Sequence, residues 1–238
     1  MADAAQLPGR LESVRDRIAR ACARSGRVPG SVRLLPITKG FPAGTVIEAM
    51  RFGITEFGES RVQEAEGKIA AIEPRPRWHL VGHLQSNKAR RAVQLFDVIE
   101  SLDSAAIADE VAGRAAQAGR TIAGLVEVNT SGDRAKFGVA PGDALRLLEH
   151  VRNSSAIELK GLMTIGPLEG GPEGARASFR ALAAIKDRAV RAGILAGDAE
   201  LSMGMSDDFE IAIEEGATIV RVGSALFGPR PSGAKAAG

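Results

Sequence analysis

The sequence of 238 residues has no tyrosine, one tryptophan and a single cysteine, Cys22. One cysteine excludes an intramolecular disulfide. Its Ala/Arg-rich surroundings lack metal-ligand spacing, so we expect Cys22 to pack in the interior. The chain also lacks any run of about 18 apolar residues, and its N-terminus lacks the apolar core of a signal peptide. These absences predict a cytoplasmic protein that does not cross a membrane.

The chain also has almost no excess of positive or negative charge, since its formal net charge is only +2. A nucleic-acid-binding domain usually carries a basic stripe. The densest basic cluster, Lys88, Arg90 and Arg91 with Arg75 and Arg77 upstream, is typical of a solvated helix face. We therefore expect no nucleic-acid partner.

What the chain does have is a regular alternation of apolar runs and helical patterns. The runs predict strands over 33–39, 54–60, 78–83, 97–103, 124–130, 159–166, 200–205 and 219–228. The patterns between them predict helices over 44–52, 61–71, 86–96, 104–118, 141–152, 173–192 and 207–215, with a further helix near 9–25. Eight such units predict an α/β fold, a single (β/α)8 TIM-type barrel with an extra N-terminal helix. An open doubly wound sheet is the alternative, which the absence of GxGxxG after the first strand weakens.

No linker divides the chain, so we expect 1–238 to form a single domain with an ordered core over 9–228 and a tail over 229–238. The Pro/Gly-rich stretch 166–174 is interpreted as a long loop. Pro36 lies inside the first strand, where proline has no N–H for the ladder. We keep this strand but expect weaker hydrogen bonding there.

Polar residues collect at the carboxyl ends of the predicted strands, which form the active face of a parallel barrel. They are Lys39, Glu59, Ser60, His83, Asp103, Ser104, Asn129, Thr130, Ser131, Thr164, Ser202, Ser206, Arg221, Gly223 and Ser224. Singly, each suits a turn or a cap, and Ser104 and Ser206 suit helix N-caps.

Strand periodicity places Lys39 on the same face as Leu35 and Ile37, and Arg221 on the face of Gly223. An arginine facing a barrel interior is costly unless it is paired. The small residues at Gly223 and Ser224 let backbone N–H groups approach an anion, and "LSMGMS" adds Ser202 in the neighbouring loop. A lysine facing a phosphate cup suggests pyridoxal 5′-phosphate (PLP) held as a Schiff base. Arg221 beside the pyridine nitrogen would keep that nitrogen unprotonated.

Several segments carry a family resemblance: "LLPITKG", "FGESRVQEAEGKI", "WHLVGHLQSNKAR", "VEVNTSGDRAKFGV" and "LSMGMSDDFEIAIEEGATIVRVGSALFG". Through them the chain resembles the PLP homeostasis proteins, barrels related to the N-terminal domain of alanine racemase. The resemblance implies PLP bound covalently to Lys39, phosphate contacts from Ser202, Gly223 and Ser224, and Arg221 near the pyridine nitrogen. It implies storage and delivery of PLP without established turnover. The cofactor-binding residues that we expect are Lys39, Ser60, His83, Ser202, Met203, Arg221, Gly223 and Ser224.

Two departures from the family pattern bear on these expectations. The family usually has asparagine where this chain has Ser60, and a small aliphatic residue where it has Pro36. Serine is shorter than asparagine, so the contact of Ser60 with the cofactor is in question.

Two other functions stay open at this point. A PLP-dependent amino-acid racemase needs an acid or base on each face of the cofactor, and its usual tyrosine is absent, although His83 could replace it. A PLP-free binding module would make Lys39 merely structural. We expect no catalytic residue and no metal site, with His79 as an interior histidine and His150 solvated. PLP-dependent apoenzymes are the expected acceptors, and a monomer the expected state.

Overall fold

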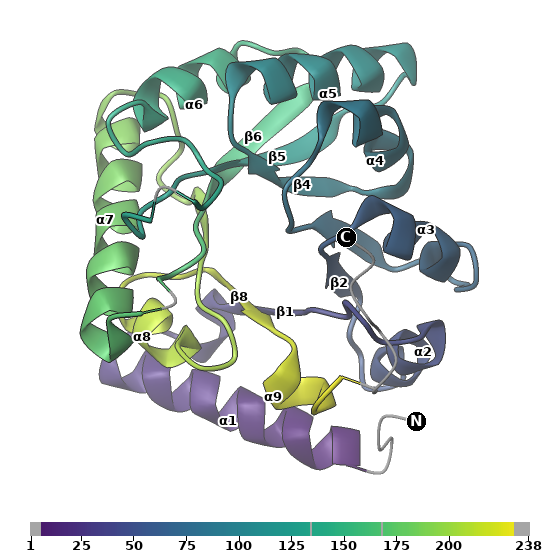
Figure 1. The fold of residues 1–238 in the computed structure, drawn as a ribbon. Helices are drawn as coiled ribbons and strands as arrows, with labels where there is room; N and C mark the ends of the chain where they lie inside the picture. The colour runs from purple at the N-terminus through teal and green to yellow at the C-terminus, as the bar shows by residue number, and fades with distance from the viewer. Residues whose placement is uncertain (1–5, 134, 168, 231–238) are drawn as a thin grey trace.

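The computed structural model describes residues 6–133, 135–167 and 169–230. Eight parallel strands form one sheet in the order β1-β8-β7-β6-β5-β4-β3-β2. Figure 1 shows them as a ring with helices outside it. The strands are β1 Arg33–Pro36, β2 Glu56–Glu59, β3 Arg77–Leu80, β4 Val98–Leu102, β5 Ile122–Glu127, β6 Ile157–Met163, β7 Glu200–Ser202 and β8 Ile219–Val222. The fold is therefore the expected (β/α)8 TIM-type barrel, and not an open doubly wound sheet.

Helices follow the strands, as parallel pairing of successive strands requires. They are α2 Ala43–Met50, α3 Val62–Ile69, α4 Ala89–Leu95, α5 Ala105–Gln117, α6 Ala144–Arg152, α7 Gly171–Arg191, α8 Phe209–Glu214 and α9 Ser224–Phe227, with short 3-10 turns at η2 Pro29–Ser31 and η3 Ser86–Lys88. The expected last strand, 219–228, is wrong in its second half. Gly223 ends the strand, and residues 224–227 form α9 instead.

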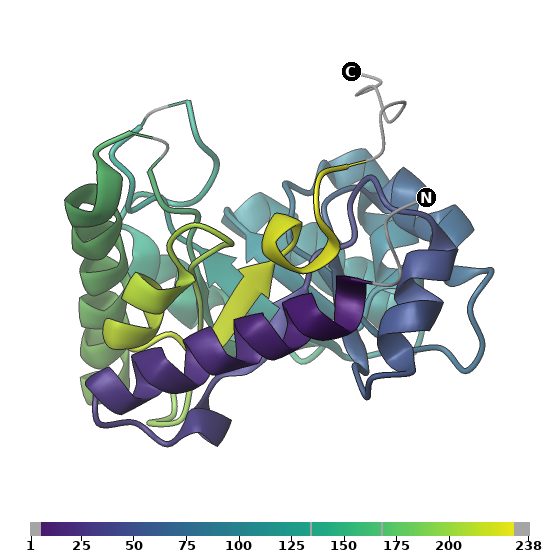
Figure 2. The same ribbon diagram turned by 90° about the horizontal axis from the view of Figure 1, so that it is seen from below.

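The extra N-terminal helix, α1 (Leu7–Arg24), is also confirmed. Its apolar residues recur every three or four positions, so that one face is buried, including the single cysteine. This helix lies beside α8 and α9 (Figure 2) and so links the start of the chain to its last two helices. No helix in the described ranges is both long and apolar enough to cross a membrane. The expected tail over 229–238 falls, from residue 231 on, outside the described residues.

Side chains alternate along each strand, so some buried side chains fill the barrel interior and the others pack between the sheet and the helices. Leu35, Ile37, Val81 and Ile219 form a cluster inside the barrel, and Val98, Ala123, Leu125 and Met163 form a second one. Large aromatic side chains such as Trp78 and Phe57 pack outside, between the sheet and the helices. Leu35 and Ile37 therefore fill the interior below Lys39, as the strand period predicts.

Pro36 lies at the seam where the barrel closes. Odd-numbered residues of this segment donate toward β8, as Ile37 does to the carbonyl of Val222 at 2.9 Å. Even-numbered residues face β2, and Thr38 donates to the carbonyl of Gly58 at 3.0 Å. The missing N–H of Pro36 thus faces β2. Between β1 and β2 the described residues form only an isolated bridge, Ile37 with Gly58. The weakened hydrogen bonding expected at Pro36 is located there.

Candidate functional site

Lys39 lies in a turn three residues after the end of β1, at the carboxyl end of the barrel. Its side chain is half-buried, and its amine has no hydrogen bond or ion pair within the described residues. Burial lowers the pKa of the Lys39 amine, and the positive charges of Arg230 and Arg221 lower it further, against the opposing charge of Glu59. A lysine amine in this setting loses its proton more readily than a solvated one, and the neutral amine is the nucleophile.

The backbone on both sides of Lys39 is held by buried charged groups of β2 and α3. Lys68 donates to the Thr38 carbonyl at 2.7 Å and also to Glu59. Glu59 accepts from the Thr38 hydroxyl as well, and Glu64 accepts from the Gly40 N–H. The side chain of Lys68 is 5 % exposed and that of Glu59 is fully buried. We name Glu59, Glu64 and Lys68 the lysine-loop clamp, because they hold the residues before and after Lys39.

Arg221 lies inside the barrel, as the sequence predicts, and it is 4 % exposed. Its guanidinium donates to the Ser202 hydroxyl at 2.8 Å and to the Thr164 carbonyl at 2.7 Å. Burial lowers the pKa of Arg221, whereas the acidic groups Glu100, Glu127 and Asp208 oppose that shift. The arginine therefore has the partners that an interior position requires.

Ser202 connects Arg221 to a second buried pair. Its hydroxyl donates to Glu100, whose other oxygen lies 2.7 Å from Nδ1 of His79. Burial alone would raise the pKa of Glu100, but the hydrogen bond from His79, together with the charge of Arg221, brings it below its usual value. His79 is thus an interior histidine, whose Nε2 atom forms no hydrogen bond in the described residues and lies 3.8 Å from Glu56.

The small-residue turn after β8 presents backbone N–H groups to a single oxygen. Gly223 and Ala225 donate to the hydroxyl of Ser206 at 3.3 and 3.2 Å. Ser206 is therefore not the helix cap that the sequence suggests, whereas Ser104 does cap α5 by accepting from Ile107 N–H. Two donors converging on one acceptor form a small cradle for an oxyanion.

Ser60 and His83 lie together after β2 and β3. Both line a cavity of about 550 Å³ between the loops that follow β2 and β3. His83 stacks on Phe137, with ring centroids 3.6 Å apart, and its Nδ1 lies 3.1 Å from Asp103. Gly82 lets these loops meet, because a Cβ there would lie 2.2 Å from the Ser60 carbonyl oxygen.

The expected site residues therefore lie in different parts of the barrel. Arg221 lies in the interior, Lys39 is half-buried in the turn after β1, Gly223 and Ser224 lie at the cradle, and Ser60 and His83 share the lateral cavity. Ser202 is occupied by Arg221 and Glu100. The side chain of Met203 belongs to the core cluster between sheet and helices.

Sequence reasoning missed the partners that hold these groups. Glu100 and Glu127 were part of predicted strands, and the clamp residue Lys68 of a predicted helix. The strand period alone would have placed Glu127 on the interior face, since it follows Leu125 by two. No comparable signal marks Lys68 or Thr164, because their contacts cross between distant segments.

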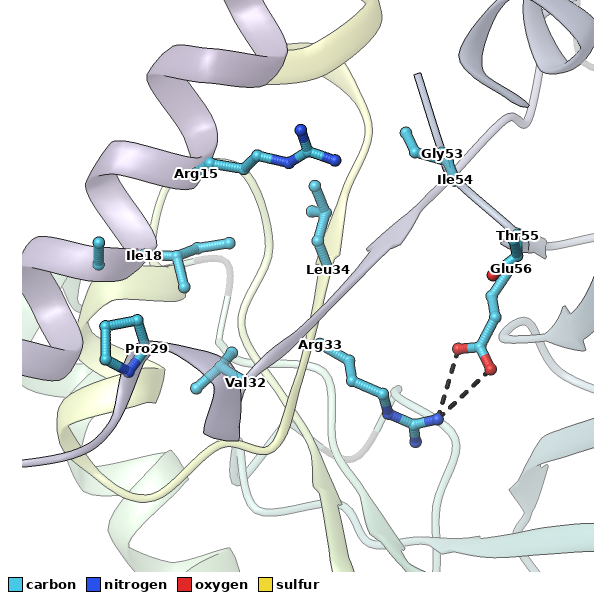
Figure 3. Close-up of a pocket in the computed structure, with 11 residues that line it drawn as sticks. Arg15, Ile18, Pro29, Val32, Arg33, Leu34, Gly53, Ile54, Thr55 and Glu56 are labelled. Atoms are coloured by element: carbon cyan, nitrogen blue, oxygen red, sulfur yellow. Dashed lines mark hydrogen bonds and ion pairs between the residues drawn. The ribbon is translucent and has the colours of Figure 1, made fainter. Parts of the chain in front are cut away.

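Another cavity, of about 510 Å³, lies at the opposite end of the barrel (Figure 3). It is bounded by α1 and by the amino ends of β1 and β2, and Arg33 pairs with Glu56 at its edge at 3.4 Å. Lys39 and Arg221 do not line it. This cavity is therefore separate from the candidate site.

We expect Glu127 to make the stability of the protein depend on pH. Burial and the charge of Asp103 raise its pKa from 4.5 to about 7. The folded state favours the neutral acid, so this contribution is complete below pH 4.5 and is lost as the pH rises through 7. The ionised carboxylate then costs about 3 kcal/mol, at about 1.4 kcal/mol per pH unit.

Glu127→Gln removes this cost. We expect the free energy of unfolding of the variant, relative to wild type, to rise by up to about 3 kcal/mol between pH 4 and pH 8. Urea unfolding of both proteins at the two pH values measures it. A difference between them that does not change with pH would contradict the assignment.

The comparisons with known proteins agree with this geometry. A barrel with a lysine after its first strand and an anion cradle after its last one defines a class of cofactor-binding barrels. Residues 10–231 match the family model "Alanine racemase, N-terminal domain". The chain is 40 % identical over 222 residues to the pyridoxal phosphate homeostasis protein of Aquifex aeolicus, covering 93 % of this chain and 97 % of that one. The chain therefore belongs to the alanine racemase N-terminal domain family and, within it, to the pyridoxal phosphate homeostasis proteins.

Comparison with solved structures agrees with this family assignment. The structure of PipY from Synechococcus elongatus with PLP bound is 38 % identical, has a TM-score of 0.78, and covers 89 % of this chain and 100 % of that one. An alanine racemase from Clostridium difficile has a TM-score of 0.75 at 15 % identity, covering 96 % of this chain and 58 % of that one. The second likeness concerns the fold alone.

Proposed function

We propose that this protein binds PLP as a Schiff base on Lys39 and serves in PLP homeostasis as a carrier and store of the cofactor. The observation that carries the proposal is the Lys39 amine: half-buried at the barrel mouth, without a hydrogen-bond partner in the described residues, and with a lowered pKa. PLP supplies an aldehyde, which a neutral amine converts into a Schiff base with loss of water.

The other residues at the mouth fit the remaining parts of PLP. The N–H groups of Gly223 and Ala225 already donate to one oxygen, that of Ser206, and would donate to a phosphate oxygen in the same way. Arg221 keeps its proton, so a ring nitrogen facing it stays unprotonated. We assign Ser202 to holding Arg221, and Ser60 and His83 to the side of the site near Lys39.

The test is the absorption spectrum of the purified protein with PLP, before and after borohydride, followed by peptide mapping. We expect a yellow protein and, after reduction, a pyridoxyl mass on the peptide that contains Lys39. A colourless protein that takes up no added PLP, or an adduct on another lysine, would refute the proposal. Assays over a broad panel of amino acids should find no racemisation, since the chain has no tyrosine to serve as the second acid or base.

We further propose that the whole chain works as one PLP-binding unit, as a monomer in the cytoplasm, and delivers PLP to PLP-dependent apoenzymes. A Schiff base on lysine supports delivery because its hydrolysis regenerates the free aldehyde. Light scattering coupled to gel filtration measures the oligomeric state. Reactivation of a PLP-dependent apoenzyme by the loaded protein, compared with free PLP, measures delivery.

A further inference from the structure

Glu127 has no role in the contacts described so far, although its carboxyl group is enclosed at the barrel mouth. It is the last residue of β5, and Ala123 and Leu125, on the same strand face, belong to an interior cluster. Glu127 is 4 % exposed. Its Oε2 atom is buried and accepts no hydrogen bond in the part of the chain that the structure describes. Such a carboxyl group is costly to keep ionised and unsatisfied.

The charged groups that face Glu127 come from β4 and β8. Asp103 and Glu100 are acidic, and Arg221 is the one cation acting on it within the described residues. Arg221 is already shared, since Ser202 connects it to Glu100. The amine of Lys136, in the loop after β5, donates to the Gly166 carbonyl. On β6, the residue paired with Glu127 is the apolar Met163.

Among the described residues, Arg221 is thus the one cation that acts on Glu127, whereas His79 contacts Glu100. One cation close to two enclosed carboxyl groups cannot offset both of their charges, so one of the two readily holds a proton. Glu100 has hydrogen bonds that favour its ionised form, whereas the buried Oε2 atom of Glu127 accepts none from the described residues. Glu127 is therefore the group that holds the proton, and its raised pKa, about 7, agrees with this.

We propose that Glu127 is the proton-uptake group of the cofactor site: when an anionic ligand enters the barrel mouth, the carboxylate of Glu127 takes up a proton from solvent, so that ligand and proton bind together. This inference rests on the proposed function, in which PLP brings its phosphate to the same mouth. Added negative charge favours the neutral acid, because it raises the cost of a nearby carboxylate. By linkage, the affinity for PLP falls as the pH rises through the range in which Glu127 ionises.

The experiment compares PLP binding by wild type and Glu127→Gln. Dissociation constants are measured by absorbance titration from pH 6 to 8.5. The number of protons taken up at pH 7 is measured by calorimetry in two buffers of different ionisation enthalpy. Proton changes at Lys39 and at PLP itself are common to both proteins, so the difference between them isolates Glu127.

We expect wild type to take up a fraction of a proton more than the variant, about half a proton at pH 7, where free Glu127 is half ionised. Its dissociation constant should rise more steeply with pH, by at most about tenfold per pH unit. The matched control is Glu200→Gln. Burial also raises the pKa of Glu200, but it pairs with Arg33 at the other end of the barrel. This control should behave as wild type.

Equal proton numbers and parallel pH curves for wild type and Glu127→Gln would overturn the inference while leaving PLP binding intact. Absence of PLP binding in wild type would overturn the proposed function and this inference with it. A measurement on wild type alone tests the inference even if Glu127→Gln does not fold. Its infrared difference spectrum on binding PLP should gain a protonated-carboxyl band, and a spectrum without that gain would also overturn the inference.

Discussion

Lys39→Ala should abolish the yellow colour of the PLP-loaded protein and the pyridoxyl mass that borohydride fixes on it. The expected effect is complete, because a Schiff base needs a primary amine and alanine has none. PLP then has only the phosphate cradle at Gly223 and Ala225 and the charge of Arg221 to hold it. Absorbance during dialysis against PLP-free buffer measures the loss, and we expect the cofactor to wash out.

The fold should survive this substitution. The Lys39 ammonium is half-buried without a hydrogen bond in the described residues, so its removal takes away a desolvation cost and no hydrogen bond that the structure describes. We expect an unfolding midpoint equal to that of wild type or slightly above it. Lys160→Ala, which removes a lysine paired with Glu158 on β6, is the matched control and should stay yellow. Retention of a borohydride-fixed adduct by Lys39→Ala would mean that another lysine is the anchor.

Lys68→Ala should be the most destabilising single substitution near the site. It removes the cation from the lysine-loop clamp and leaves Glu59 fully buried without its ion-pair partner. Breaking a buried pair from one side costs about 3–5 kcal/mol. It also frees the Thr38 carbonyl that precedes Lys39, so PLP should bind more weakly as well. Urea unfolding measures the first effect, and absorbance titration with PLP the second.

Two control variants distinguish the part of the stability loss that comes from burial of the ion pair from the part that comes from its charges. Arg91→Ala breaks an ion pair with Glu66 whose side chains are 43 % and 48 % exposed, and it should cost less than about 1 kcal/mol. The double variant Lys68→Met with Glu59→Gln removes both charges and should recover much of the loss, since no unpaired charge is then buried. If Lys68→Ala cost no more than Arg91→Ala, the clamp would not be a structural element of the site.

The fold could be predicted from the sequence because each strand–helix unit has its own local pattern. Apolar runs of strand length alternate with amphipathic stretches eight times, and only a closed parallel barrel uses that number in so short a chain. Errors lie at element ends. "RVGSALFG" was taken as strand throughout because it is apolar, but Ser224–Phe227 turns into a helix whose Leu226 and Phe227 are buried against the core.

The candidate site was predicted only in part, for an identifiable reason. Side-chain direction along a strand follows from a period of two, so the inward positions of Lys39 and Arg221 could be inferred. Hydrogen-bond partners depend on how loops from different units approach one another. Nothing local distinguishes Ser206, which accepts from Gly223, from Ser202, which is occupied by Arg221, and the pairing of Lys68 with Thr38 joins α3 to the end of β1.

The seam at Pro36 has a consequence for the order in which the protein is made. Through most of its length β1 is hydrogen-bonded to β8, with Arg33 beside Ile219, while its contact with the adjacent β2 is an isolated bridge. On the ribosome, the strand that leads into Lys39 therefore emerges early but has no ladder partner until residues 219–222 have been synthesised. Pairing over such a separation is slow because the intervening chain must first be ordered. The strand that leads to Lys39 thus takes its place in the sheet only after β8 has been made and has paired with β1.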